Sequence, residues 1–115
     1  MINSVNRFHG HGSLRFVYKN GEAVRSHLFT IKYIQNPRRK KSRIAIVISK
    51  KVVKGAVKRN RIRRRIYEII RLRLPHFTTV YDVALIAISS ELLNISHHDL
   101  SQQIDELLRQ AGIIK

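Results

Sequence analysis

Residues 58–70 read KRNRIRRRIYEII, and this stretch combines the densest positive charge of the chain with a regular apolar stripe. A helix advances by about 100° per residue, so residues three, four and seven apart share a face. The apolar residues that share one face are Ile62, Ile66, Ile69 and Ile70. Burying an isoleucine stabilises a fold by about 1.5–3 kcal/mol before entropy is counted. The pattern therefore predicts a helix that packs through its isoleucines.

The opposite side of this predicted helix is polar and almost entirely basic. It carries Asn60, Arg61, Arg63, Arg64, Arg65, Tyr67, Glu68 and Arg71. Because five arginines share a single acid, we expect most of their guanidinium N–H donors to lack protein partners. Arginine is suited to bidentate contact with phosphate and to stacking on bases. Arg59 lies near the edge of the apolar stripe, where its stem can pack while its charged end reaches solvent.

Positive charge is concentrated around this helix rather than spread along the chain. The chain has 115 residues and a net charge of +16, and 16 of its 23 Lys and Arg residues lie between residues 38 and 73, with Glu68 as the only acid there. Four lysines precede the arginines: Lys50, Lys51, Lys54 and Lys58. Like charges repel, so this concentration indicates a polyanionic partner such as a nucleic acid.

Composition limits the class of protein. A hydrophobic fraction of 43% indicates a globular chain, and its length suits a single domain covering residues 1–115. The absence of cysteine excludes disulfides. No apolar run approaches about 18 residues, and no signal-peptide pattern opens the chain. We therefore expect a cytoplasmic protein without a membrane partner.

The remaining periodicities predict an α+β fold with helices packed on one small sheet. We expect strands over residues 27–35, 43–49 and 80–88, and the unbroken apolar run of the second predicts a central position in the sheet. The predicted helices cover residues 13–19, with Ser13 as N-cap, 56–74, ended by Pro75, and 97–110, with Ser96 as N-cap and Gly112 at the end. Residues 1–12 are expected to be irregular.

No residue pattern predicts a protein nuclease centre or a metal site. His9 and His11 could chelate a metal weakly, but no nearby carboxylate or cysteine completes a site. His97 and His98 fall in a first helical turn, where solvent-facing side chains are usual. A major-groove DNA reader is disfavoured, because an arc of arginines with one asparagine offers little for reading bases.

Residues 49–64, SKKVVKGAVKRNRIRR, closely resemble the signature of the bacterial ribonuclease P protein subunit family. That family carries a strand that ends in Ser/Ala-Lys-Lys and then an Ala-Val-x-Arg-Asn-Arg-x-x-Arg helix. The resemblance extends over residues 13–110 and includes the turn at Asn20 and Gly21, the strand at Phe29, and Asp82 at the start of the following strand.

This resemblance implies an α-β-β-β-α-β-α order, similar to the second domain of ribosomal protein S5, with a left-handed βαβ crossover and an edge strand over residues 22–26. It implies a subunit of the endonuclease that removes the 5′ leader of precursor tRNA. In that family the ribonuclease P RNA performs the chemistry with Mg²⁺, and the protein itself holds no cofactor. The implied partners are that RNA and the precursor tRNA.

The resemblance also implies the site residues. The catalytic RNA would be contacted by Lys50, Lys51, Arg59, Asn60, Arg61, Arg63 and Arg64, and the charge pattern adds Lys54, Lys58 and Arg65. A leader-binding cleft would be lined by Leu14, Val17, Tyr18, Thr30, Lys32, Asn60, Arg63 and Tyr67. Leu14 and Lys32 replace residues that are often aromatic in the family, which favours an electrostatic hold on the leader, although Phe16 could restore stacking if the first helix is rotated. Composition alone fits a ribosomal or general RNA-binding protein equally well.

Overall fold

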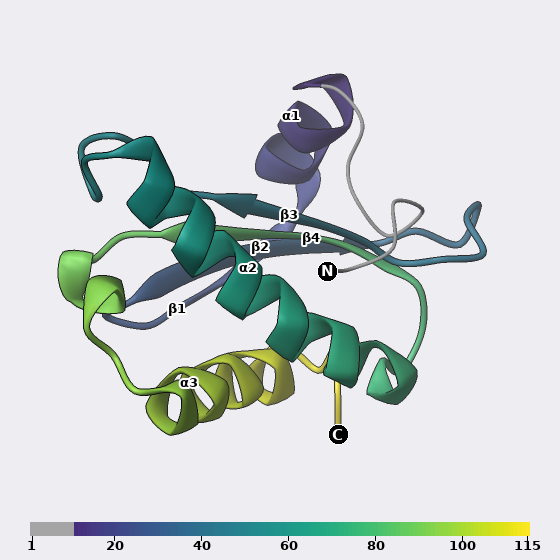
Figure 1. Cartoon of the computed structure of the whole chain (residues 1–115). Coiled ribbons are helices and arrows are strands. Elements are labelled where there is room, and N and C mark those ends of the chain that lie inside the picture. Colours follow the sequence, from purple (N-terminus) through teal and green to yellow (C-terminus); the bar gives the residue numbers. More distant parts are fainter. Residues whose placement is uncertain (1–10) are drawn as a thin grey trace.

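The computed structural model describes residues 11–115, with side chains from Leu14 onward. The helices are α1 (His11–Asn20), α2 (Ala56–Arg73) and α3 (His97–Gln110). The strands are β1 (Glu22–Arg25), β2 (Phe29–Gln35), β3 (Arg43–Val47) and β4 (Tyr81–Ala87). Short 3₁₀ turns, η2 (Leu74–His76) and η3 (Ser90–Leu93), follow α2 and β4. The predicted α+β class and α-β-β-β-α-β-α order are confirmed (Figure 1).

The four strands form one mixed sheet in the order β1-β2-β4-β3. β2 is antiparallel to both of its neighbours, whereas β3 and β4 are parallel. The predicted central position of residues 43–49 is therefore wrong, because β3 lies at an edge. The apolar run of β3 has a different cause, because Ile44 and Ile46 belong to the core shared with α2. At the strand edge, Arg63 Nε of α2 lies 3.4 Å from the Ile46 carbonyl oxygen.

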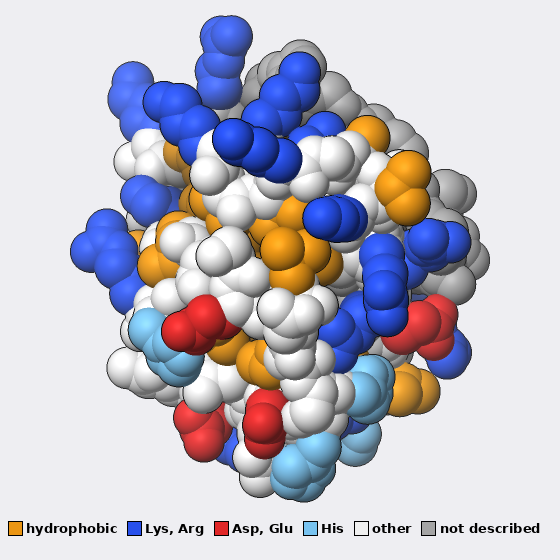
Figure 2. Space-filling model, turned by 60° about the vertical axis from the view of Figure 1, so that its left-hand side comes forward, with side chains coloured by type: hydrophobic (Ala, Val, Ile, Leu, Met, Phe, Trp, Pro, Cys, Tyr) orange, Lys and Arg blue, Asp and Glu red, His pale blue; other side chains and the backbone are white. Residues whose placement is uncertain are grey.

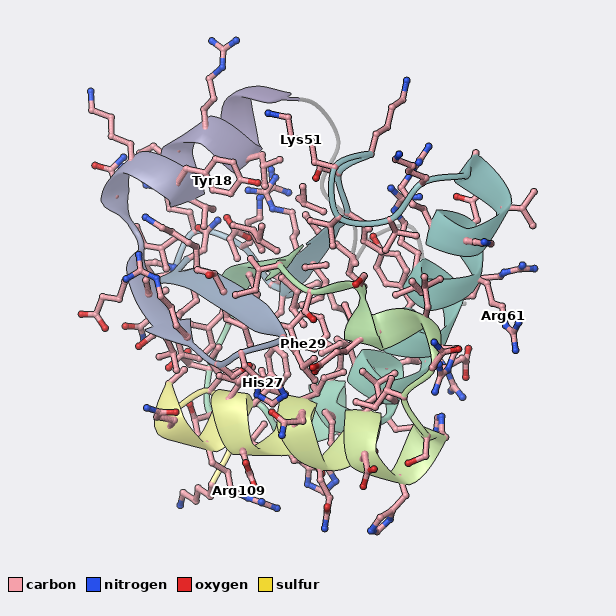
Figure 3. The ribbon with its side chains drawn as sticks, turned by 90° about the vertical axis from the view of Figure 1, so that its left-hand side faces the viewer. Tyr18, His27, Phe29, Lys51, Arg61 and Arg109 are labelled. Atoms are coloured by element: carbon pink, nitrogen blue, oxygen red, sulfur yellow. The ribbon has the colours of Figure 1, made fainter. Side chains whose placement is uncertain are left out.

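α2 connects the two parallel strands by a left-handed crossover. β3 leads into α2, and the chain returns into β4 on the inner side of β3, with α2 below the sheet in Figure 1 and to the lower right in Figure 3. About 98% of such connections are right-handed, so the hand is unusual. The arrangement leaves the outer edge of β3 beside α2.

The two faces of the sheet are covered differently. α2 and α3 cover one face, with α2 near β3 and α3 near β1, and α1 lies over β2 and β4 on the other face (Figure 1). The large hydrophobic core is on the α2 and α3 side, and it includes the predicted stripe Ile62, Ile66, Ile69 and Ile70. Val17 of α1 and Ala84 of β4 are fully buried outside that core. α1 is therefore attached by a separate, small apolar contact.

The helix ends match the sequence signals in most places. α2 begins after Gly55, whose φ of 91° favours glycine. The Ser96 hydroxyl accepts a hydrogen bond from the Asp99 amide at 3.1 Å, which caps α3. The Ser13 cap was wrong, because α1 begins at His11, and the expectation of irregular chain fails for residues 11 and 12. His9 of the predicted His9 and His11 pair lies outside the described residues, as does the rest of the segment 1–10. None of the described helices has the length and apolarity to cross a membrane.

Gly21 lies where the end of α1 meets β2, and we expect Gly21→Ala to destabilise the fold. A Cβ at this position would be 2.6 Å from the Val17 carbonyl oxygen and 2.8 Å from the Tyr33 carbonyl oxygen. Both contacts are with backbone, so relief requires a chain shift that costs about 1–3 kcal/mol. Urea unfolding should show this loss, whereas Asn20→Ala, an exposed neighbour, should change the unfolding free energy by less than about 1 kcal/mol. Equal stability of the Gly21 variant and wild type would contradict the packing described.

Candidate nucleic-acid interface

The N-terminal half of α2 and the turn before it present a group of exposed cations, here called the cation group. Its members are Lys50, Lys51, Lys54, Lys58, Arg61 and Arg64. Within the described part of the chain, none of these six forms an ion pair with a carboxylate. In Figure 3, Lys51 projects from the turn on the α1 side of the sheet and Arg61 projects sideways from α2. The six charges are therefore available to an anionic partner.

Three further arginines of α2 are half-buried and bound to backbone carbonyls. Arg59 Nη1 donates to the Val53 oxygen at 3.1 Å, and Arg65 Nη2 donates to the Ile95 oxygen at 2.8 Å. Arg63 Nη1 donates to Asn60 Oδ1 at 2.8 Å, in addition to its longer contact with Ile46. Of the five arginines on the predicted polar side, Arg63, Arg65 and Arg71 each use only one or two of their five N–H donors, so the expectation that most of these donors lack protein partners is confirmed within the described residues. A carbonyl bond leaves the positive charge and several of the five N–H donors in place, so these arginines are held in position while remaining cationic.

The C-terminal half of α2 has carboxylate partners and is closer to charge balance. Arg71 pairs with Glu68 on the same helix at 3.0 Å, and Arg73 forms two hydrogen bonds with Asp105 of α3. The hydrogen bond to Asp105 raises the pKa of Arg73 further above its already high ordinary value. Uncompensated positive charge is therefore concentrated at the N-terminal end of α2.

The backbone at the start of α2 has the same electrostatic sign. No side chain caps its N-terminus, and its first turn contains no acid. The first amide groups of a helix lack partners within the helix, and the helix dipole places partial positive charge there. Lys54 and Lys58 flank this end. The lysine side chains and the backbone amides at the N-terminus of α2 thus both favour an anionic ligand there.

The predicted cleft residues of α1 and β2 lie on the α1 side of the sheet. Leu14, Tyr18, Thr30 and Lys32 are half-buried, whereas Val17 is fully buried, so Val17 anchors α1 and is not available to a ligand. Lys32 Nζ donates to the Tyr18 carbonyl at 3.0 Å, which satisfies an oxygen in the last turn of α1. Burial raises the pKa of the Tyr18 phenol above its ordinary value, so this hydroxyl stays protonated near pH 7.

The predicted cleft residues of α2 lie across the edge of the sheet from the α1 set. Asn60 is exposed, Arg63 is half-buried beside β3, and Tyr67 packs against the core. Between the two sets runs β3, whose Ala45 and Val47 face the α1 side and are half-buried. The edge position of β3, which the sequence did not predict, thus separates the α1 and α2 groups of cleft residues.

A buried ion pair between Arg43 and Asp82 joins β3 to β4 where these two strands begin. The sequence did not predict this pair. Arg43 donates to both oxygens of Asp82, at 2.9 and 2.7 Å, and Asn36 Nδ2 donates to Asp82 Oδ2 at 2.8 Å. Arg43 and Asp82 are cross-strand partners of β3 and β4. An acid at the start of a buried strand was the available signal, because such a carboxylate requires a partner.

The surface charge is divided. Figure 2 shows Lys and Arg side chains gathered over the upper part of one face, with Asp, Glu and His side chains in the lower part. The upper part corresponds to α1 and the beginning of α2, and the lower part to α3 (Figure 1). Together the fold and this surface define a small α+β domain with a strongly positive face, whose charge suits a polyanion.

Comparison with known proteins identifies the family. The Ribonuclease P family model matches residues 2–112, and the chain belongs to this family. The ribonuclease P protein component of Clostridium kluyveri is 30% identical over 112 residues, which is 96% of this chain and 98% of that protein. That of Roseiflexus castenholzii is 38% identical over 78 residues, which is 68% of this chain but only 63% of that protein's length.

Solved structures match the fold. The RNase P protein of Staphylococcus aureus superposes with a TM-score of 0.85 at 24% identity, covering 96% of this chain and 98% of that one. The RNase P protein of Thermotoga maritima gives a TM-score of 0.74 at 22% identity, covering 84% of this chain and 89% of that one. These likenesses confirm the architecture, including the four-stranded mixed sheet.

Proposed function

We propose that this chain is the protein subunit of a ribonuclease P, a ribonucleoprotein that removes the 5′ leader of precursor tRNA. The observation that carries the proposal is the cation group, six exposed charges without a described carboxylate partner at one end of α2, in a chain of this family. Two RNAs repel each other when they meet. If the basic face of α2 contacts the catalytic RNA, its positive charge lowers that repulsion and supports binding of the precursor tRNA.

The cleavage chemistry is assigned to the RNA, with Mg²⁺ bound there. Among the described residues, no group of three His, Cys, Asp or Glu side chains is placed to hold a metal ion. The side chains of the His27–Glu91 pair are 64% and 66% exposed, so this pair is not enclosed. The protein's own contribution is to bind and orient. Arg59, Arg63 and Arg65 suit this role, since their backbone bonds reduce the conformational freedom that binding would otherwise remove.

The leader is proposed to pass along the exposed side of β3, between the two groups of cleft residues. Tyr18 offers a neutral aromatic ring on the α1 side, and Asn60 and Arg63 offer polar groups on the α2 side. Lys32 is already bound to the Tyr18 carbonyl but keeps further ammonium donors for a phosphate. The leader would thus be held mainly by charge.

A reconstitution assay tests the proposed function. The chain is mixed with a bacterial ribonuclease P RNA and a precursor tRNA at low Mg²⁺, where the RNA alone is slow. We expect added protein to raise the rate of 5′ leader removal. If the protein binds RNA but gives no gain in cleavage, it is a general or ribosomal RNA-binding protein and the proposal is wrong.

The double variant Arg61→Ala/Arg64→Ala should weaken binding to the catalytic RNA. Each lost phosphate contact should reduce the slope of log affinity against log salt by about 1, so the double variant should lose about 2. These two arginines are preferable to Arg59, whose bond to the Val53 carbonyl ties its removal to folding. Filter binding at several salt concentrations provides the measurement.

The matched control is Arg109→Ala/Lys115→Ala, which removes the same charge from exposed sites at the α3 end. Figure 3 places Arg109 at the end of the molecule opposite Lys51. The control should leave the salt slope within about 0.5 of wild type if its residues make no phosphate contact. Equal losses in both double variants would show that net charge alone, rather than the α2 face, determines affinity.

A further inference from the structure

The ring of Phe16 is the most exposed aromatic feature of α1. It is 57% exposed, although an aromatic side chain normally gains stability by burial. No other aromatic ring of the described residues stacks against it. The ring does not join the cleft residues beside Lys32. Instead it lines a hollow together with Ile34, Pro37 and Arg38.

The hollow lies between α1 and the loop that joins β2 to β3. Ile34 and Pro37 give it an apolar wall, Gln35 and Asn36 contribute amides, and Arg38 contributes an exposed cation at the rim. The loop, which extends beyond the sheet in Figure 1, continues with Arg39, Lys40 and Lys41, all exposed. One aromatic face next to several cations matches the chemistry of a nucleotide, with a flat base and a negative phosphate.

Among the described residues, one acid lines this hollow, and it does not oppose a phosphate there. Asp82 lines it, but both of its carboxylate oxygens accept hydrogen bonds from Arg43, and Oδ2 also accepts one from Asn36. The carboxylate charge is therefore balanced inside the fold. The net charge that faces the opening is positive, from Arg38 and its neighbours.

We propose that this hollow is a nucleotide subsite for single-stranded RNA, in which a base stacks on Phe16 and the adjoining phosphate contacts Arg38. It lies at the end of the sheet away from the cation group and is separate from the leader-binding residues beside β3. The inference rests on the proposed RNA-binding function and extends it with a second contact point. A protein segment is the disfavoured occupant, since the rim is strongly basic.

The test compares two labelled oligoribonucleotides of about ten nucleotides, within the usual length for such sites, one with bases and one abasic. Phe16→Ala should weaken binding of the base-bearing oligomer by about 5- to 150-fold, the effect of losing one stacked base. It should leave the abasic oligomer unchanged. Phe16→Tyr, which keeps the ring, should restore binding. Arg38→Ala should weaken both oligomers by similar factors.

Phe16→Trp adds a direct reporter, because the chain contains no tryptophan. The base-bearing oligomer should quench the new fluorescence, and the abasic oligomer should not. Ile88→Ala, which truncates another exposed apolar side chain, is the control and should bind both oligomers as wild type does. If Phe16→Ala binds both oligomers as wild type does, or if the tryptophan is not quenched, the subsite is wrong.

The reconstitution assay separates this inference from the proposed function. Normal stimulation of cleavage by the wild-type chain, together with unchanged oligomer binding by Phe16→Ala, overturns the subsite only. A base-dependent loss in Phe16→Ala, together with no stimulation of cleavage by wild type, supports the subsite and overturns the proposed function.

Discussion

Raising the salt concentration from about 50 to 200 mM should weaken binding to the catalytic RNA by roughly 10³-fold if only the six members of the cation group contact phosphates. Each neutralised phosphate releases counterions, and the fourfold rise in salt acts on every such contact. If Arg59, Arg63 and Arg65 also contact phosphates, nine contacts give a loss of roughly 10⁵-fold. The salt slope therefore tests whether arginines bound to backbone carbonyls still bind RNA.

The measurement is equilibrium filter binding with Mg²⁺ held constant across the salt series. A slope of log affinity against log salt that corresponds to about six phosphate contacts would confine the interface to the exposed cations. A slope that corresponds to about nine would add Arg59, Arg63 and Arg65. An affinity that stays flat across this range would contradict a phosphate-based interface and the proposed function with it.

Asp82→Ala should destabilise the protein by about 3–5 kcal/mol, because it removes the carboxylate that balances the buried charge of Arg43. The side chains of this pair are only 9% and 4% exposed, so water cannot replace the lost contacts. Asn36 loses a hydrogen-bond acceptor in the same step. The free energy of unfolding in urea measures the effect, and the pair joins β3 to β4 at the end of the sheet that carries the Phe16 hollow.

Two controls make this result interpretable. Arg71→Ala breaks an exposed pair with Glu68, at 48% and 43% exposure, and should cost at most about 1 kcal/mol. Replacing both buried partners with apolar residues, as in Arg43→Met/Asp82→Leu, should recover much of the loss, since no unpaired charge remains. A small effect of Asp82→Ala would mean that Arg43 finds other partners.

Helix α2 shows how much of the structure a local sequence pattern can predict. The four isoleucines predicted from helical spacing are the buried ones, and the predicted helices 56–74 and 97–110 match α2 and α3 to within one residue. Spacing works here because it depends only on neighbours within two turns. The exposure of Lys58, Arg61 and Arg64 follows from the same geometry.

The α1 region was less predictable. Its start was misplaced, and Val17, which lies between exposed Phe16 and half-buried Tyr18, proved to be a buried anchor rather than part of a cleft. Whether a residue on a short helix faces a ligand or the sheet depends on how that helix is docked. No local signal contains that information, because α1 is held by the Gly21 turn and by Lys32 from another element.

The sequence pattern by itself determined strands β2, β3 and β4, helices α2 and α3, the apolar stripe of α2 and the concentration of charge, because each is set by residues close together along the chain; strand β1 was expected only from the family resemblance. Only the tertiary structure decided that β3 is an edge strand, that Arg65 is held by Ile95, and that Asp82 neutralises Arg43. These contacts join residues 30 and 39 positions apart. The physical reason is that strand order and side-chain pairing depend on which surfaces meet after folding. The periodicity of residues along the chain does not specify which surfaces meet.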